Sequence, residues 1–224
     1  VLTNSEFFEE FCRQYNPNSY MVGQGCDVSH FNDEDDSIKI PDEFKDIPSP
    51  VFGYVGSLTS LRLDIELLEF VAEQKKDWSI VLVGPEDEDF KNSNLHNMSN
   101  VYFLGRKDAS ELPNYVKGFD ITTNPQLKNN LTIGNYPRKI DEYLAMGKPI
   151  VATNTKAMQM FKEHVYLADT KEDYVILIDK AIAENTSDSI KNRIEYAKSH
   201  TWTNNVKAIY NSIIKATKQK IKWD

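Results

Sequence analysis

Three charged residues follow a proline in the segment Gly134–Thr153. Arg138 and Lys139 come directly after Pro137, and Glu142 comes three residues after Lys139. Two cations here can neutralise phosphate oxygens, and a carboxylate can accept hydrogen bonds from both hydroxyls of a ribose. A helix that begins here would add free backbone N–H groups, which favour phosphate. The segment therefore predicts half of a nucleotide-diphosphate site, with an ordinary surface pair between Glu142 and Arg138 as the alternative.

Two glycine-containing loops could complete such a site. Gly56 and Ser57 follow an apolar run, and Arg62 lies just beyond them. Glycine would let a phosphate approach backbone amides, and the arginine would clamp it. At Gly105 and Arg106, the backbone N–H and C=O groups could pair with the edge of a nucleobase. A plain loop or β-turn is the alternative at both places, because every protein of alternating strands and helices has such turns.

Other kinds of chemistry find little support. The four histidines have no cysteine or acid nearby at metal-ligand spacing, so we interpret them as structural or surface residues and predict neither a metal nor a cofactor. No nucleophile–base pair is visible, which disfavours a hydrolase. Asp120 lacks the acidic cluster of a phospho-acceptor receiver domain. The formal net charge of −8 argues against a nucleic-acid partner, and two cysteines make no disulfide framework.

The elements that would position these residues alternate between strand and helix. Strands are expected at 51–55, 79–83, 101–104, 119–122, 150–153 and 165–167. Helices are expected at 6–15, 63–73, 111–117, 138–146, 173–184 and 190–198, with Ser5 and Ser110 as the caps of the first and third. A short helix should follow the strand at 150–153 and end at about 163, and a last helix should follow residue 202. Nearly continuous apolar strands in such an order are typical of a parallel sheet covered on both faces. We therefore predict an α/β, Rossmann-like parallel sheet flanked by helices, with a helical C-terminal segment.

In such a sheet, ligands bind at the carboxyl ends of the strands. The loops expected to meet at this edge are those at Gly56, Gly84, Gly105, Asn124 and Gly134. The 224 residues contain no apolar run near the ~20 residues of a membrane span. The acidic start, without an initiator methionine, indicates a piece of a longer chain without a signal peptide, and a reducing cytoplasm is the expected location. Residues 32–50 are acidic and proline-rich, which predicts a solvated linker.

Taken together, these motifs resemble the nucleotide-sugar-binding half of retaining glycosyltransferases of the GT-B fold, the group 1 type. The resemblance covers nearly the whole chain in order. The most specific segment is Pro-Arg-Lys-Ile-Asp-Glu-Tyr-Leu-Ala-Met-Gly-Lys-Pro-Ile-Val-Ala-Thr at 137–153. Further matching segments lie at 16–31, 53–58, 81–85, 100–105, 111–120 and 200–202 with the last helix.

The resemblance implies a division of the chain. Residues 1–31 would be a remnant of an N-terminal acceptor domain that is otherwise missing, and 32–50 a linker. Residues 51–200 would bind a nucleotide-diphosphate sugar of the UDP or GDP type, and 201–224 would form a helix that crosses back to the partner domain. The implied activity is metal-independent transfer of the sugar, with retention, to a polysaccharide or glycolipid acceptor, although the isolated chain should be inactive. Peripheral membrane association of the full-length protein stays open.

Two rivals remain: a GT-B-like nucleotide-sugar epimerase and a non-catalytic nucleotide-sugar-binding module. Among single residues, Glu142 matches the family glutamate that holds the ribose, and Arg62 stands for a lysine of the diphosphate pair. Ser57 stands where an arginine is usual. Gly134 stands where a second glutamate normally touches the donor hexose, and Lys139 could compensate. No catalytic residue is assigned. The expected substrate-binding set is Gly56, Ser57, Arg62, Gly105, Arg106, Gly134, Asn135, Tyr136, Arg138, Lys139 and Glu142.

Overall fold

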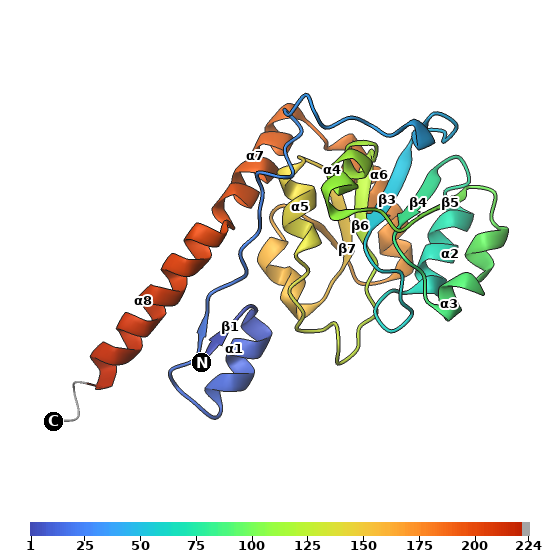
Figure 1. Ribbon diagram of the computed structural model, residues 1–224. Helices are drawn as coiled ribbons and strands as arrows, with labels where there is room; N and C mark the ends of the chain where they lie inside the picture. The colour runs from blue at the N-terminus through green and yellow to red at the C-terminus, as the bar shows by residue number, and fades with distance from the viewer. Residues whose placement is uncertain (221–224) are drawn as a thin grey trace.

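A six-stranded parallel sheet forms the centre of the protein in a computed structural model that describes residues 1–220 (Figure 1). Its spatial order is β5-β4-β3-β6-β7-β8. The strands are β3 (Val51–Val55), β4 (Ser79–Val83), β5 (Val101–Gly105), β6 (Ile121–Asn124), β7 (Ile150–Thr153) and β8 (Tyr166–Ala168). The chain enters this sheet at β3 in the middle and adds β4 and β5 toward one edge. It then adds β6, β7 and β8 on the other side of β3. The strand order reverses between β3 and β6, and a ligand crevice is expected at such a switch point.

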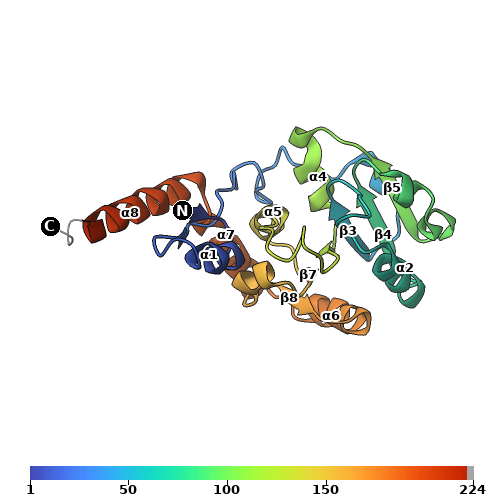
Figure 2. The same cartoon turned by 90° about the horizontal axis from the view of Figure 1, so that it is seen from below.

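Helices cover both faces of the sheet, as predicted (Figure 2). One buried cluster joins the sheet to α4, α5 and α7, and a second joins its other face to α2 and α6. The helices are α1 (Glu6–Arg13), α2 (Ile65–Gln74), α3 (Glu88–Lys91), α4 (Leu112–Lys117), α5 (Lys139–Ala145), α6 (Lys171–Ala183), α7 (Ser187–Ser199) and α8 (Trp202–Lys220). The α/β class and the parallel sheet are therefore confirmed.

Several predicted boundaries were wrong for local reasons. The helix expected from residue 63 begins at Ile65, because Asp64 caps it by accepting from the Leu67 N–H at 2.9 Å. Ser110 is not a cap: Asp108 holds that position before a short 3₁₀ turn, and its N–H donates to the Glu111 carboxylate at 3.2 Å. The short helix expected up to residue 163 is a 3₁₀ helix at Lys156–Phe161.

The first 50 residues pack beside the main sheet without joining it. β1 (Leu2–Thr3) and β2 (Tyr20–Met21) form a separate two-stranded parallel sheet next to α1. The acidic run at 33–36 is exposed, as expected of a linker. The rest of 32–50 is less solvated than expected, because Ile38, Phe44 and Ile47 pack against the core.

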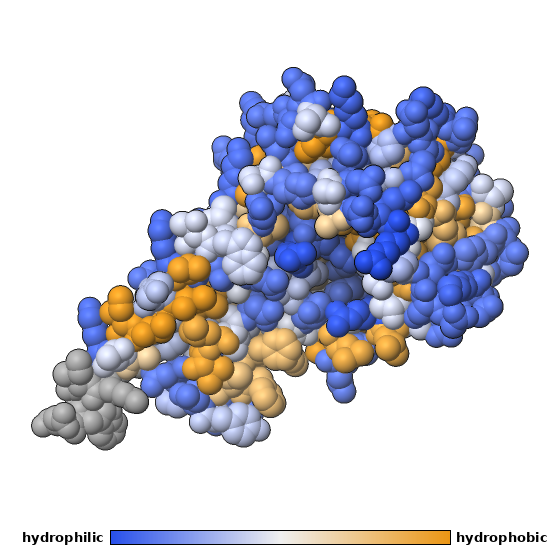
Figure 3. Space-filling model, viewed as in Figure 1, coloured by the Kyte–Doolittle hydropathy of each residue, from blue (hydrophilic) through white to orange (hydrophobic). Residues whose placement is uncertain are grey.

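α8 projects away from the body of the protein (Figures 1 and 2). Apolar side chains lie exposed along it, among them Val206, Ile213 and Ile214, and Figure 3 shows an apolar patch over this helix. The predicted final helix is confirmed up to Lys220, and 221–224 lie outside the described residues. Within residues 1–220, no helix is both long and apolar enough to cross a membrane.

Candidate functional site

A cavity of about 420 Å³ opens at the carboxyl edge of the sheet, at the switch point between β3 and β6. The loop after β3, the end of β6, the start of α5 and the N-terminal segment all contribute to its wall. The polar and glycine residues of the wall are Gln24, Tyr54, Gly56, Arg62, Asn124, Gln126, Asn135, Tyr136, Arg138, Lys139 and Glu142. Seven predicted site residues therefore share one cavity: Gly56, Arg62, Asn135, Tyr136, Arg138, Lys139 and Glu142.

The loop after β3 is shaped by two glycines. Gly56 has φ +144°, a conformation that side chains rarely allow, and Gly84 after β4 has φ +155°. A Cβ at Gly84 would overlap the Gly56 carbonyl, so the two loops touch backbone to backbone. A Cβ at Gly56 would lie 2.8 Å from the Lys139 ammonium. The absence of side chains here therefore leaves room for a cation next to the exposed backbone.

The ammonium group of Lys139 is fixed by a tyrosine of β3. It donates to the Tyr54 hydroxyl and lies 3.9 Å from the centre of the Tyr54 ring. α5 itself has only seven residues, so its macrodipole is short. The positive character of this wall therefore comes from side chains more than from the predicted helix N-terminus.

Glu142 faces the same cavity from α5. Its carboxylate lies 3.3 Å from the Arg138 Nε, so the predicted i, i+4 pair exists. The side chain of Glu142 is nevertheless only 17% exposed, whereas that of Arg138 is 58% exposed. Burial raises the pKa of the Glu142 carboxyl, although Arg138 and Lys139 act to lower it. The pair is thus no ordinary surface contact, because one partner is a largely buried carboxylate that lines a cavity.

The cavity is electropositive in an acidic protein. Arg62, Arg138 and Lys139 line it against the single carboxylate of Glu142, a local excess of two positive charges. Within the described residues, the Arg62 guanidinium has no ion pair or side-chain hydrogen bond. A cation left without a partner at a cavity wall can pair with an incoming anion without breaking an existing bond.

Asn124 lines the cavity although it was not among the predicted site residues; only its loop was expected at this edge. Asn124 ends β6 and is 1% exposed, yet neither atom of its side-chain amide has a hydrogen-bond partner in the described structure. Buried amides are normally paired, so this one is poised for a ligand or water in the cavity. Its position at the end of β6 was the available signal, because ligands bind at the carboxyl ends of such strands.

A buried aspartate supports the loop of the cavity. Asp141 is fully buried, accepts a hydrogen bond from the Tyr136 hydroxyl at 2.7 Å, and lies 2.7 Å from His200 Nδ1. A buried carboxylate needs such partners. Tyr136 lines the cavity, so Asp141 ties the ligand-facing loop to the end of α7. Two of the histidines interpreted as structural or surface residues form single pairs with an acid: His200 with Asp141, and His96 with Glu86 at 2.7 Å.

Four predicted site residues do not line the cavity. Ser57, Gly105 and Arg106 lie on strand-end loops outside its wall, and the Arg106 side chain is exposed. Gly134 is buried beneath α1: a Cβ there would overlap the Phe7 ring, and Ser5 Oγ donates to the Gly134 carbonyl at 2.7 Å. The described residues also contain no group of three or more His, Cys, Asp or Glu arranged to hold a metal.

A parallel sheet in this order, with a polar cavity at its switch point, defines a Rossmann-like α/β domain. Residues 49–194, more than half of the chain, match the family "Glycosyl transferases group 1". The chain therefore belongs to that family, and its fold is one half of the GT-B architecture.

Similar proteins are considerably longer. The putative teichuronic acid biosynthesis glycosyltransferase TuaH of Bacillus subtilis (strain 168) is 29% identical over 174 residues, which span 75% of this chain and 43% of TuaH. Anabaena Alr3699/HepE in complex with UDP superposes with a TM-score of 0.77 at 17% identity, over 94% of this chain and 62% of that one. Sucrose-phosphate synthase of Thermosynechococcus elongatus superposes with a TM-score of 0.73 at 18% identity, over 96% of this chain and 58% of that one. At such identities the superpositions establish the fold.

Proposed function

We propose that the cavity binds the nucleoside diphosphate part of a UDP- or GDP-sugar. The observation that carries this proposal is the buried carboxylate of Glu142 beside Arg62, Arg138 and Lys139 in one cavity. A carboxylate shielded from water accepts two hydroxyl hydrogen bonds strongly, which suits the ribose. The surplus of cations suits the diphosphate. The UDP bound to Alr3699/HepE, a protein of the same fold, supports the same choice.

The other residues of the cavity would act around the Glu142 carboxylate and the three cations. Asn124 offers an unpaired amide donor and acceptor to the sugar or phosphate. Asn135 and Tyr136 form the loop wall, which Asp141 holds in place. Gly56 lets the diphosphate approach the backbone. Pairing of the nucleobase with the backbone at Gly105 and Arg106, and contacts from Ser57 and Gly134, stay predictions of the resemblance.

The reaction we propose is transfer of the sugar to a polysaccharide or glycolipid acceptor, with retention and without a metal. The three cations of the wall would stabilise the leaving diphosphate, a task that other enzymes give to a divalent ion. The family match and the name of TuaH both favour a transferase over the epimerase and the binding module. A cytoplasmic location is also part of this proposal.

We further propose that this chain is the donor half of a two-domain enzyme. Residues 1–31 would be the remnant of the acceptor domain, 32–50 the linker and 51–200 the donor domain. The crossing helix, expected over 201–224, would be α8, and 221–224 lie outside the described residues. The exposed apolar residues of α8, with Phe11 and Tyr15 at α1, support this division, because they offer an apolar surface to a further domain. The longer relatives point the same way. The 224 residues alone should transfer no sugar.

Calorimetric titration with UDP and GDP tests the binding proposal. We expect one of them to bind, chelation with EDTA to leave the affinity unchanged, and Glu142→Ala to weaken it. Glu73→Ala, an exposed change on α2, is the matched control. Failure of both nucleotides to bind would refute the proposed function, and loss of binding with EDTA would refute metal independence. Turnover of UDP-sugars by the isolated chain would refute the two-domain proposal.

A further inference from the structure

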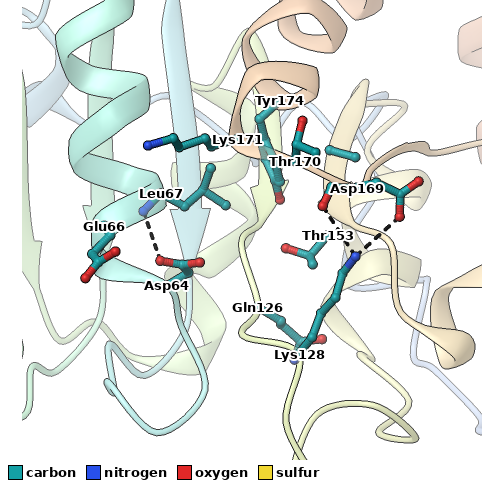
Figure 4. Close-up of a pocket in the computed structure, with 11 residues that line it drawn as sticks. Asp64, Glu66, Leu67, Gln126, Lys128, Thr153, Asp169, Thr170, Lys171 and Tyr174 are labelled. Atoms are coloured by element: carbon teal, nitrogen blue, oxygen red, sulfur yellow. Dashed lines mark hydrogen bonds and ion pairs between the residues drawn. The ribbon is translucent and has the colours of Figure 1, made fainter.

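A second cleft lies on the other face of the sheet edge. It has a volume of about 300 Å³ and opens between the N-terminal ends of α2 and α6, above the ends of β7 and β8 (Figure 4). Gln126 is the one described residue that lines both this cleft and the nucleotide cavity. The second cleft is therefore a neighbour of the proposed donor site and not a part of it.

Two buried oxygen atoms of this cleft lack partners. Thr153 and Gln126 are 8% and 6% exposed, and neither Thr153 Oγ1 nor Gln126 Oε1 has a partner at hydrogen-bond geometry. Figure 4 shows the Thr153 hydroxyl pointing into the space between Asp64 and Lys128. The Tyr174 hydroxyl is the polar group that interacts with Thr153. It also donates to the Val151 carbonyl at 3.4 Å and accepts from the Thr123 hydroxyl at 3.4 Å, so it satisfies Thr153 only in part. Leaving buried polar atoms unpaired is costly, so the cleft is built to receive hydrogen-bonding groups.

The charges around the cleft are mixed, with Lys128 paired to Asp169 at 3.3 Å, so they favour neither an anion nor a cation. Asp64, Glu66 and Asp169 would repel a phosphate or carboxylate. Lys128 and Lys171, together with the N-terminus of the 13-residue α6, would repel a metal ion. An apolar molecule would leave both unpartnered oxygens unsatisfied. A neutral polyol is the remaining class, because each of its hydroxyls can donate to a carboxylate or amide oxygen and accept from an ammonium group.

The lining of the cleft also includes apolar surface beside its polar groups. Leu67, Ala168 and the ring of Tyr174 form this surface. A sugar ring has the matching character, since its C–H faces are apolar and its edge carries hydroxyls. We infer that this cleft binds one neutral sugar unit of a glycan, beside the donor cavity and separated from it by Gln126. The naming of a glycan as occupant rests on the proposed function; the polyol chemistry rests on the cleft alone.

The test measures the binding of methyl glycosides to the full chain by ligand-observed NMR, with UDP present in excess. The probes are the methyl glycosides of glucose, galactose and N-acetylglucosamine. Thr153→Val keeps the shape and removes the hydroxyl, so the affinity for the best probe should fall about five- to tenfold. The matched control is Thr155→Val, because Thr155 is also buried and unpartnered but lies outside the cleft. That variant should bind the probe as the unmodified chain does.

Three results would overturn the inference. The first is that no glycoside binds at millimolar concentration. The second is that Thr153→Val binds like Thr155→Val, which would mean that water alone fills the cleft. The third is that Glu142→Ala abolishes glycoside binding, which would place the sugar in the donor cavity. UDP binding is measured in the same samples, and its absence would count against the proposed function. The response to Thr153→Val would still show whether the second cleft binds the glycoside.

Discussion

Glu142→Gln should make the protein more stable at neutral pH and poorer at binding UDP. The change keeps the size and one acceptor oxygen of the side chain but removes its charge. Hydrogen bonds to a charged acceptor are worth about 1.5–3 kcal/mol, against about 0.5–1.5 kcal/mol for a neutral one. The difference of about 1–1.5 kcal/mol corresponds to a roughly tenfold rise in the Kd of UDP.

The stability effect follows from the pKa of Glu142. Burial raises this pKa above 4.5, so the folded chain holds the proton more tightly than the unfolded chain does. The free energy of unfolding therefore falls as the pH rises from 4.5 through the raised value, and the ionised carboxylate costs stability above it. Glutamine cannot ionise. The variant should match the unmodified protein below pH 4.5 and exceed its melting temperature at about pH 7.

The assays are calorimetric titration and thermal unfolding across this pH range, with Glu73→Gln as the exposed control. Titration with 2′-deoxy-UDP sharpens the test. Because this ligand lacks one ribose hydroxyl, its affinity should change less than that of UDP when Glu142 is replaced by glutamine. Equal Kd values of the variant and the unmodified chain for UDP would refute the ribose role. A stability difference that does not change with pH would refute the argument from the buried carboxylate.

Three further predictions concern the cavity and the loops that shape it. Lys139→Met should weaken the binding of UDP more than the binding of uridine, because it removes a cation from the diphosphate region; calorimetric titration measures both affinities. Lys156→Met, outside the cavity, should change neither affinity. Asn124→Leu should raise the melting temperature of the free protein, since it removes a buried unpaired amide, and should weaken the binding of a UDP-sugar. Gly84→Ala should lower the free energy of unfolding in urea by more than about 1 kcal/mol, because its Cβ would overlap the Gly56 carbonyl at φ +155°; unchanged unfolding would contradict the close approach of the two loops.

The sequence predicted the sheet well because its strands are apolar on both sides. The runs at 51–55, 79–83 and 150–153 coincide with β3, β4 and β7. Such strands need no partner information to be recognised, since a buried parallel strand is hydrophobic throughout. The helix starts were less predictable, because several residues before a helix can serve as its cap. Ser110 was the predicted cap, and the position of the Glu111 carboxylate shows that Asp108 holds that place instead.

The same contrast holds for the site. Arg138, Lys139 and Glu142 are close in sequence, so a single helix places them together, and the order of the loops brings Arg62 to the same edge. The support behind them depends on long-range packing. Nothing near Asp141 in the sequence indicates that His200 will face it, and an unpaired amide at Asn124 is visible only once all its neighbours are placed.

Gly134 shows how a sequence difference can change its meaning in the structure. From the sequence it is the position where the family glutamate is missing, which suggests lost function. In the structure, the Phe7 ring lies where a Cβ at Gly134 would have to be, and Ser5 of the same segment binds the Gly134 carbonyl. A side chain at position 134 would therefore push α1 away from the loop that leads to Asn135 and Tyr136. The glycine is required by a contact that the N-terminal segment makes, so the missing carboxylate is coupled to the way this segment closes over the loop.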